Sequence, residues 1–163
     1  MAATFQLIER NGAPPGTATD KTSAPIRFKN ADNATVDLNN PMVVSGVSDF
    51  SFEKWIGLNI TGGSYTQITN IRAYSDGGNG FGTGVLAWAR AAASYAAPVQ
   101  PTASTGLTFL FSLTSASPLS LGGGPYSGTG MIGSYLVLTC EVQPTAAGGV
   151  TPTEAVSFGW DEI

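Results

Sequence analysis

The sequence predicts an all-β protein: an antiparallel β-sandwich or jelly-roll-like domain with long Gly/Pro-rich loops and an extended N-terminal arm. Apolar and polar residues alternate with a period of two in most apolar segments, as they do in strands that bury one face. No segment carries the apolar stripe of a long helix, and Gly/Pro turns separate the short alternating segments. The 163 residues suffice for one domain with a real hydrophobic core.

The N-terminal region divides into a strand and a stretch without strand character. Residues 4–10 alternate and are predicted to form a first short strand. Residues 11–24 are rich in Gly, Pro and Thr and cannot bury enough apolar surface to fold alone, so we expect a loop or an extended arm. The expected organisation is a strand and arm over residues 1–24, followed by the sandwich domain over residues 25–163.

The sandwich is expected to begin with two short strands. Residues 25–29 form the first, with Ile26 and Phe28 on one face. A turn-rich stretch covers residues 30–40, and an apolar strand follows over residues 41–44.

The longest alternation in the first half covers residues 49–60. Its apolar side chains share one face, which Lys54 interrupts, and Trp55 lies on the other face. This strand is therefore expected to be covered on both sides. Gly62-Gly63 turns the chain and residues 65–74 return it, which predicts an antiparallel hairpin.

The second half continues the pattern, for a total of eight to ten strands. Strands are expected at residues 85–90, 107–113 and 131–142, and in the alternation of Val156, Phe158 and Trp160. Residues 89–93 fit either a helical turn or a strand. Loops are expected at residues 76–84, which hold five glycines, at 98–105 and at the flexible excursion 115–130.

Charge is sparse and dispersed along the chain. Charged residues are 11% of the sequence, against roughly 25% in an ordinary soluble domain. A weakly charged surface suits permanent contacts, because few ions must be desolvated on assembly. The net charge of −4 is modest for keeping monomers apart, so the composition indicates an assembling protein.

The same charges exclude several partners. The seven Lys and Arg residues form no run, so we expect no nucleic-acid partner. No stretch of about 18 apolar residues is present, and no basic region precedes an apolar core at the N-terminus. We therefore expect neither a membrane span nor a secretory signal.

Catalytic residue types are missing or isolated. The chain has no histidine, which removes the commonest general base and metal ligand, and we expect no enzymatic activity, no metal site and no cofactor. The single cysteine, Cys140, alternates with apolar residues and is predicted to be a small buried hydrophobe.

The carboxylates do not form a convergent pair. Asp161 and Glu162 are adjacent, so on a strand they point to opposite faces. Glu53, Glu141 and Glu154 each lie on or next to a strand opposite an apolar row, which predicts solvated side chains.

Two further patterns favour structure over binding. The loop over residues 76–80 lacks the alternating oxygen ligands of a calcium site, and residues 80–84 lack the Lys-Ser/Thr of a phosphate loop. The aromatic residues, including Trp55, Trp88 and Trp160, are expected to fill the core or an interface, although a carbohydrate-stacking platform is an alternative.

Five segments in order resemble small virion structural proteins of tailed bacteriophages, of the head-decoration type. They are SFEKWI at residues 51–56, TQITNIR at 66–72, YAAP at 95–98, SYLVL at 134–138 and FGWDE at 158–162. The chain departs from the usual tyrosine-glycine pattern before the Tyr-Pro segment, where it has Trp88-Ala89-Arg90.

The resemblance implies a capsid-decorating protein that binds the assembled lattice of the major capsid protein and stabilises it. It further implies a homo-oligomer, most often a trimer, made in the host cytoplasm and located on the outer capsid surface. The residues predicted to contact the partner lie in the N-terminal strand and arm: Phe5, Leu7, Ile8, Pro14 and Pro15. The alternatives are a tail or baseplate component and a carbohydrate-binding receptor module.

Overall fold

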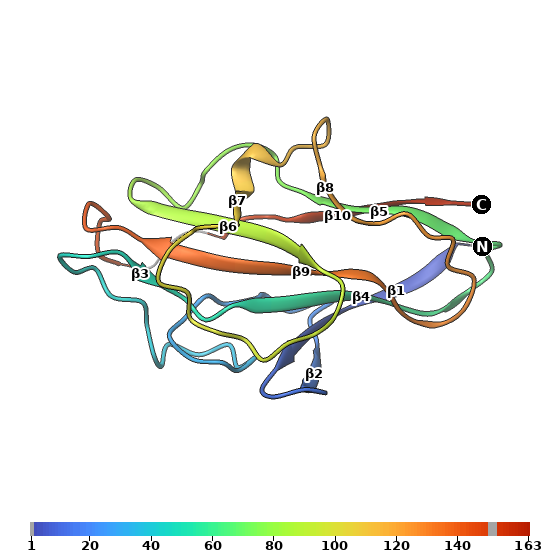
Figure 1. Ribbon diagram of the computed structural model, residues 1–163, viewed down its shortest axis with the longest axis horizontal. Helices are drawn as coiled ribbons and strands as arrows, with labels where there is room; N and C mark the ends of the chain where they lie inside the picture. Colours follow the sequence, from blue (N-terminus) through green and yellow to red (C-terminus); the bar gives the residue numbers. More distant parts are fainter. Residues whose placement is uncertain (1, 150–152) are drawn as a thin grey trace.

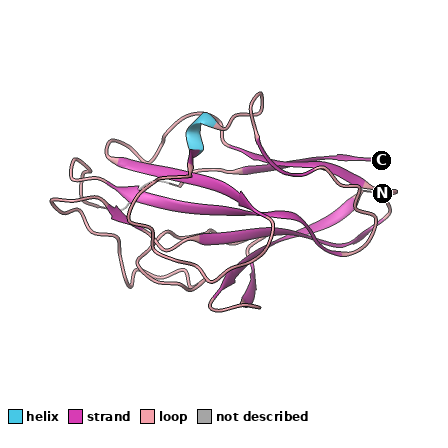
Figure 2. Ribbon diagram, viewed as in Figure 1, coloured by secondary structure: helices cyan, strands magenta, loops and turns pink. Residues whose placement is uncertain are grey.

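The computed structural model describes residues 2–149 and 153–163 and confirms an all-β protein. The described chain forms ten strands and a single turn of 3-10 helix, η1 (Leu110–Ser112). The strands make two antiparallel sheets of seven and three strands, consistent with a β-sandwich (Figures 1 and 2).

The larger sheet, here sheet A, has the order β2-β1-β4-β9-β6-β7, with β3 paired to β9. Its strands are β1 (Ala3–Asn11), β2 (Thr17–Asp20), β3 (Asp49–Phe50), β4 (Lys54–Gly63), β6 (Val85–Ala92), β7 (Thr108–Phe109) and β9 (Gly130–Val142). The smaller sheet, sheet B, has the order β10-β5-β8. Its strands are β5 (Ile68–Tyr74), β8 (Leu119–Gly122) and β10 (Ser157–Glu162).

The main core lies between the two sheets and follows from the alternation of β4 and β9. Ile56, Leu58 and Ile60 of β4 point to the same face and are each at most 2% exposed. They meet Leu136 of β9 and Ile71 of sheet B in one cluster of buried apolar side chains. These three apolar side chains of β4 therefore form its contact with sheet B.

The opposite face of β4 is also covered, as expected from Trp55. The Trp55 ring is 2% exposed and packs edge-on against Tyr95, with ring centroids 5.4 Å apart. Arg90 lies over the same indole, 5.0 Å from its centroid. The central strand of sheet A is thus buried on both faces, which explains its nearly continuous burial.

The expected N-terminal arm is wrong as a structural element. Residues 17–20 form β2, which pairs with β1 through Asn11↔Thr17 and Ile8↔Asp20. Gly12 and Gly16 supply the positive φ angles of the connection. Composition correctly predicted that this stretch buries little apolar surface, but the hydrogen bonds that order it come from β1 of the same chain.

Residues 25–29 and 41–44, predicted as strands, do not form strands. Ile26 and Phe28 do pack against the core, and Val43 and Val44 are 54% and 40% exposed. Neither segment has a neighbouring strand, so their alternation reflects contacts with a cavity wall and with solvent. The alternation of apolar and polar residues therefore predicted two strands that the sheets do not contain.

Three other expectations need correction. The long strand at residues 49–60 is split into β3 and β4, because Phe52 and Glu53 donate their N–H groups to the Lys29 and Val99 carbonyls. The expected hairpin of residues 49–60 and 65–74 is not formed, because β4 belongs to sheet A and β5 to sheet B.

The last correction concerns residues 107–130. Only Thr108–Phe109 pair as a strand before η1, and the expected flexible excursion contains β8, an edge strand of sheet B. The strands at 85–90, at 131–142 and at the C-terminal end are confirmed, and residues 89–92 belong to β6.

We predict that Leu136→Ala destabilises the fold by about 2–5 kcal/mol, because it removes a fully buried side chain from the contact between the sheets. Val47→Ala is the matched control, since Val47 is 71% exposed and its truncation should change stability by less than about 0.5 kcal/mol. Urea unfolding monitored by tryptophan fluorescence measures both. Equal midpoints for the two variants would refute the assignment of Leu136 to the core.

Candidate interaction surface

One end of the sandwich is covered by loops and not by sheet B. There the inner side chains of sheet A, such as Leu138 and Cys140, face Phe28, Met42 and Val44 across a cavity of about 860 Å³. The cavity is lined mainly by apolar residues of sheet A, of residues 24–44 and of residues 153–158. The connection from β2 to β3 thus takes the place that a further strand of sheet B would occupy.

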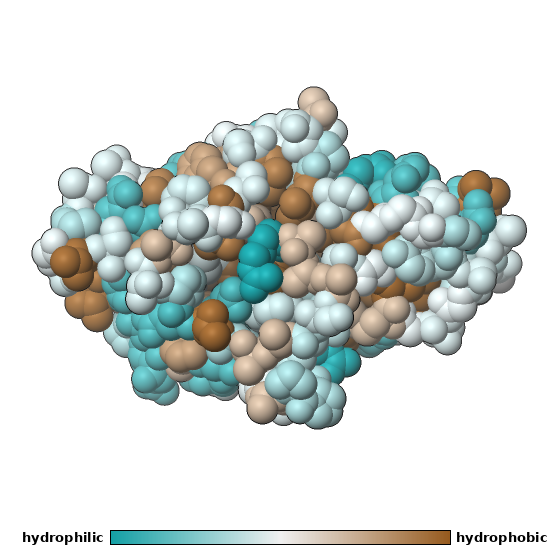
Figure 3. Space-filling view, in the orientation of Figure 1, coloured by the Kyte–Doolittle hydropathy of each residue, from teal (hydrophilic) through white to brown (hydrophobic). Residues whose placement is uncertain are grey.

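This connection exposes most of the large apolar side chains on the described surface. Val36, Leu38, Val43, Val44 and Val47 account for five of the seven exposed large hydrophobic residues, and Leu38 is 72% exposed. We call residues 36–47 the apolar loop. Apolar side chains that gather in this way are typical of a surface that contacts a partner. In the space-filling view, separate apolar patches lie among polar side chains (Figure 3).

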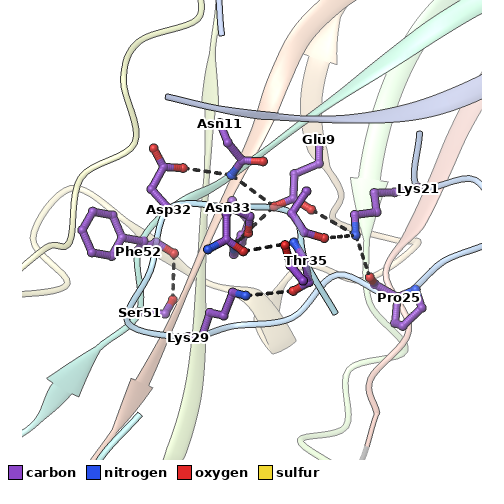
Figure 4. A network of polar contacts seen from close by, with 12 residues as sticks. Glu9, Asn11, Lys21, Pro25, Lys29, Asp32, Asn33, Thr35, Ser51 and Phe52 are labelled. Carbon is purple, nitrogen blue, oxygen red and sulfur yellow. Dashed lines mark hydrogen bonds and ion pairs between the residues drawn. The ribbon is translucent and has the colours of Figure 1, made fainter. Parts of the chain in front are cut away.

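The segment before the apolar loop is held by all three lysines of the chain. Figure 4 labels two of them, Lys21 and Lys29, beside Asn33 and Thr35 of this segment. Lys54 Nζ donates to the Asn33 carbonyl at 2.9 Å, Lys21 Nζ to the Ala34 carbonyl at 2.6 Å, and Lys29 Nζ to the Thr35 carbonyl at 2.8 Å. Three ammonium groups therefore bind three successive carbonyls of residues 33–35. We call Lys21, Lys29 and Lys54, with the acidic residues that pair with them, the lysine cluster.

Glu9 of β1 is the central acid of the lysine cluster. Its carboxylate lies 3.2 Å from Lys54 Nζ and 3.7 Å from Lys21 Nζ, and all three side chains are at most 3% exposed. Lys29 pairs instead with Asp37 at 3.1 Å. Two acids thus pair with three lysines, and Asp32 adds a third negative charge that acts on Lys54. Compensation of this kind is what burial of charged groups requires.

Burial and pairing act on the protonation of this cluster in opposite directions. Burial lowers the pKa of Lys54, and the nearby Glu9 carboxylate partly offsets the effect. The hydrogen bond from Lys29 lowers the pKa of Asp37. Asp32 accepts from Asn11 Nδ2 at 2.9 Å and from the Gly12 N–H at 2.8 Å, which ties the end of β1 to the same segment.

The outer face of sheet A buries two acids that the sequence predicted to be solvated. Glu53 is 6% exposed and accepts from Arg90 at 2.7 Å and from the Trp55 indole at 3.0 Å. Glu141 is 7% exposed and accepts from the Trp88 indole at 2.9 Å. The prediction failed because the indole and guanidinium groups of the same face cover and satisfy these carboxylates. Glu154 is half-buried.

The structure separates the five residues predicted to contact a partner. Phe5 and Leu7 point into the core, where Phe5 lies 4.2 Å from the Trp160 ring. Ile8 is half-buried on the opposite face of β1, and Pro14 and Pro15 are exposed in the turn between β1 and β2. A partner that binds this region could therefore contact Pro14 and Pro15, whereas Phe5 and Leu7 are occupied by the core.

Reactive and ligating groups are sparse in the described structure. Cys140 is buried among Val85, Val142 and Ala146, as predicted, and burial raises its pKa to about 12. Within residues 2–149 and 153–163, no three His, Cys, Asp or Glu side chains come together as a metal would require. No helix in the same residues has the length and apolar character needed to span a membrane.

Searches of protein families, of curated proteins and of solved structures with this chain returned no match.

The apolar loop and the lysine cluster were not anticipated from the sequence. The valines at residues 36–47 suggested at most a short strand, because a sequence does not show whether an apolar residue lacks a neighbour. A signal for the cluster was present in Lys54, the one charged residue on the apolar face of a long alternation. A charge at such a position requires a buried partner.

We predict that Lys21 and Lys29 resist acylation by an amine-reactive ester in the folded protein, because their side chains are 3% and 2% exposed and hydrogen-bonded. Both should react in urea. Peptide mass mapping after a short exposure at neutral pH measures the labelling. Equal labelling with and without urea would show that the lysines are accessible and the cluster open.

We also predict that Cys140 does not react with iodoacetamide at pH 8. Its pKa of about 12 leaves almost no thiolate there, whereas an unfolded cysteine, with a pKa near 9, ionises partly. Intact mass with and without urea gives the readout. Stoichiometric alkylation of the folded protein would contradict the burial of this thiol.

Proposed function

We propose that this chain is a non-enzymatic structural protein of a phage virion, and that it decorates the outer surface of the capsid by binding the major capsid protein. The observation that carries the proposal is the apolar loop, where exposed apolar side chains follow a segment fixed by three buried lysines. Sparse surface charge and the ordered segments that resemble head-decoration proteins add support.

A fixed loop suits this role because little order has to be created on binding. Residues 33–35 are held by three hydrogen bonds from lysines, and within the loop the Val43 N–H donates to Asp49 at 2.7 Å. Preorganised contacts lose less conformational entropy when a partner binds. The exposed apolar side chains of the loop then contribute burial of apolar area.

In the proposed mechanism the protein stabilises the capsid by binding and performs no chemical reaction on it. A protein that binds only the assembled shell stabilises that state by mass action. Because the lattice repeats the same site many times, a modest affinity at each site is sufficient for an oligomer to remain bound. A homo-oligomer, with a trimer favoured, is part of the proposal.

The carbohydrate-binding alternative receives less support. All sixteen aromatic residues lie in the described part of the chain, and each is buried or half-buried. The close ring pairs are tilted or edge-on, such as Trp88 with Phe109 at 62°. A sugar-stacking platform requires an exposed ring face.

A tail or baseplate protein would use the same kind of contact surface as a capsid-decorating protein. The experiment below distinguishes these two locations. The jelly-roll-like refinement of the fold remains a prediction.

The test is co-sedimentation of the purified chain with expanded empty capsids of the phage that encodes it. We expect wild-type protein to pellet with the capsids. The double variant Leu38→Asp, Val43→Asp should bind at least about tenfold more weakly, because two apolar contacts are replaced by charges that must be desolvated.

Ile163→Asp is the matched control. Ile163 is 66% exposed but lies near the chain termini, away from the apolar loop, so this variant should bind like wild type. Failure of wild-type protein to pellet with expanded capsids, combined with binding to purified tails, would replace decoration by the tail alternative. Equal binding of both variants would exclude the apolar loop as the contact.

A further inference from the structure

Asn11 and Lys54 face each other across two neighbouring strands. The register of β1 and β4 pairs Glu9 with Ile56 and Arg10 with Trp55. The next pair in this register is Asn11, the last residue of β1, with Lys54, the first residue of β4. Side chains of directly opposed residues share a face, with Cβ atoms about 4.5–5.5 Å apart.

Glu9 connects the two side chains on that face. Its Oε1 atom accepts from Lys54 Nζ at 3.2 Å and from Asn11 Nδ2 at 3.4 Å. Because both nitrogens bind the same oxygen, the amine and the carboxamide lie within two hydrogen-bond lengths of each other. Glu9 and Lys54 are each 1% exposed and Asn11 is 8% exposed, so water is largely excluded from all three.

We propose that Lys54 and Asn11 join in an intramolecular isopeptide bond, which the folded protein forms by itself with Glu9 as the catalytic residue. The neutral amine of Lys54 attacks Asn11 Cγ and forms the Nζ–Cγ bond. Glu9 accepts a proton from Nζ and delivers it to Nδ2, the Cγ–Nδ2 bond breaks, and ammonia leaves. One amine and one carboxamide give one secondary amide and one ammonia, and Glu9 is regenerated.

The environment favours both the reactive form and the product. Burial lowers the pKa of Lys54 and so increases the fraction of neutral amine, which is the nucleophile. A carboxyl group that contacts both nitrogens is placed to move the proton between them. Exclusion of water then protects the new amide from hydrolysis.

A competing reaction of the same asparagine has to be separated from this one. In an Asn-Gly sequence the glycine nitrogen can attack the asparagine side chain and give a succinimide, which also releases ammonia. Here the Gly12 N–H donates to Asp32 Oδ2 at 2.8 Å, which holds that nitrogen on another group. Lys54 Nζ and Asn11 Nδ2 also donate to other groups, the Asn33 carbonyl and Asp32, each at 2.9 Å, but both contact Glu9 Oε1 as well.

The deciding experiment is mass spectrometry of the purified wild-type chain. We expect an intact mass lower than the sequence mass by one ammonia. Trypsin should then yield a branched peptide in which residues 11–21 are joined to residues 30–72, because an acylated Lys54 is not cleaved. An unshifted mass, or an ammonia loss with normal cleavage after Lys54, would overturn the proposal; the second result would identify the succinimide.

Variants assign the roles of the three groups. Lys54→Met and Glu9→Gln should each abolish the branched peptide, and Asn11→Asp should give the same product with loss of water. Asn33→Ala is the matched control, since Lys54 also contacts Asn33, but only its backbone carbonyl. A branched peptide that disappears in Asn33→Ala, or persists in Glu9→Gln, would contradict the assignment. The wild-type result decides the main question even if a variant fails to fold.

This inference does not rest on the proposed function. It requires neither capsids nor a partner, and the two experiments can fail separately.

Discussion

The structure depends on three lysines that bind three successive carbonyls. Residues 33–35 cross the inner side of sheet A where sheet B is absent, and their carbonyls need donors that no neighbouring strand supplies. Lys21, Lys29 and Lys54 supply one donor each. The ammonium groups thus satisfy backbone groups that a strand would otherwise satisfy, and the loop becomes part of the fold.

Before the proposed bond between Lys54 and Asn11 forms, burial of three ammonium groups is costly, and the surrounding acids offset this cost. Glu9 and Asp37 pair with the three lysines, and Asp32 supplies a third negative charge that acts on Lys54. Within the described residues, only Glu9 Oε2 and Arg10 Nε are buried polar side-chain atoms without a hydrogen-bond partner. Replacing a paired group by an apolar one leaves its partner charge buried, which typically costs about 3–5 kcal/mol. Such a cluster favours one position of the loop over many similar ones.

The sequence allowed the fold class and the longest strands to be predicted, because alternation in residues such as Ile56, Leu58 and Leu136 has a period that only a strand satisfies. It did not allow strand partners to be predicted. β2 was mistaken for an arm, and β4 and β5 for a hairpin, since pairing depends on chain segments distant in sequence. The candidate site was missed for the same reason: Glu9, Lys21, Lys29 and Lys54 are ordinary charged residues until the fold brings them together.

The two ends of the sandwich differ, and this has a practical consequence. β9 runs from Gly130, which pairs with Ile60 near the C-terminal end of β4, to Val142, which pairs with Asp49 of β3. Ile60 pairs in turn with Phe5 in the N-terminal half of β1, whereas Val142 lines the same cavity as Val43 and Val44 of the apolar loop. Both chain termini lie at the first end (Figure 1), where the Ala3 N–H donates to Glu162 at 3.1 Å. A peptide or fluorescent protein fused to either terminus would therefore project away from the apolar loop. If that loop faces a shell, the fused peptide or protein would lie on the side of the chain that points away from the shell.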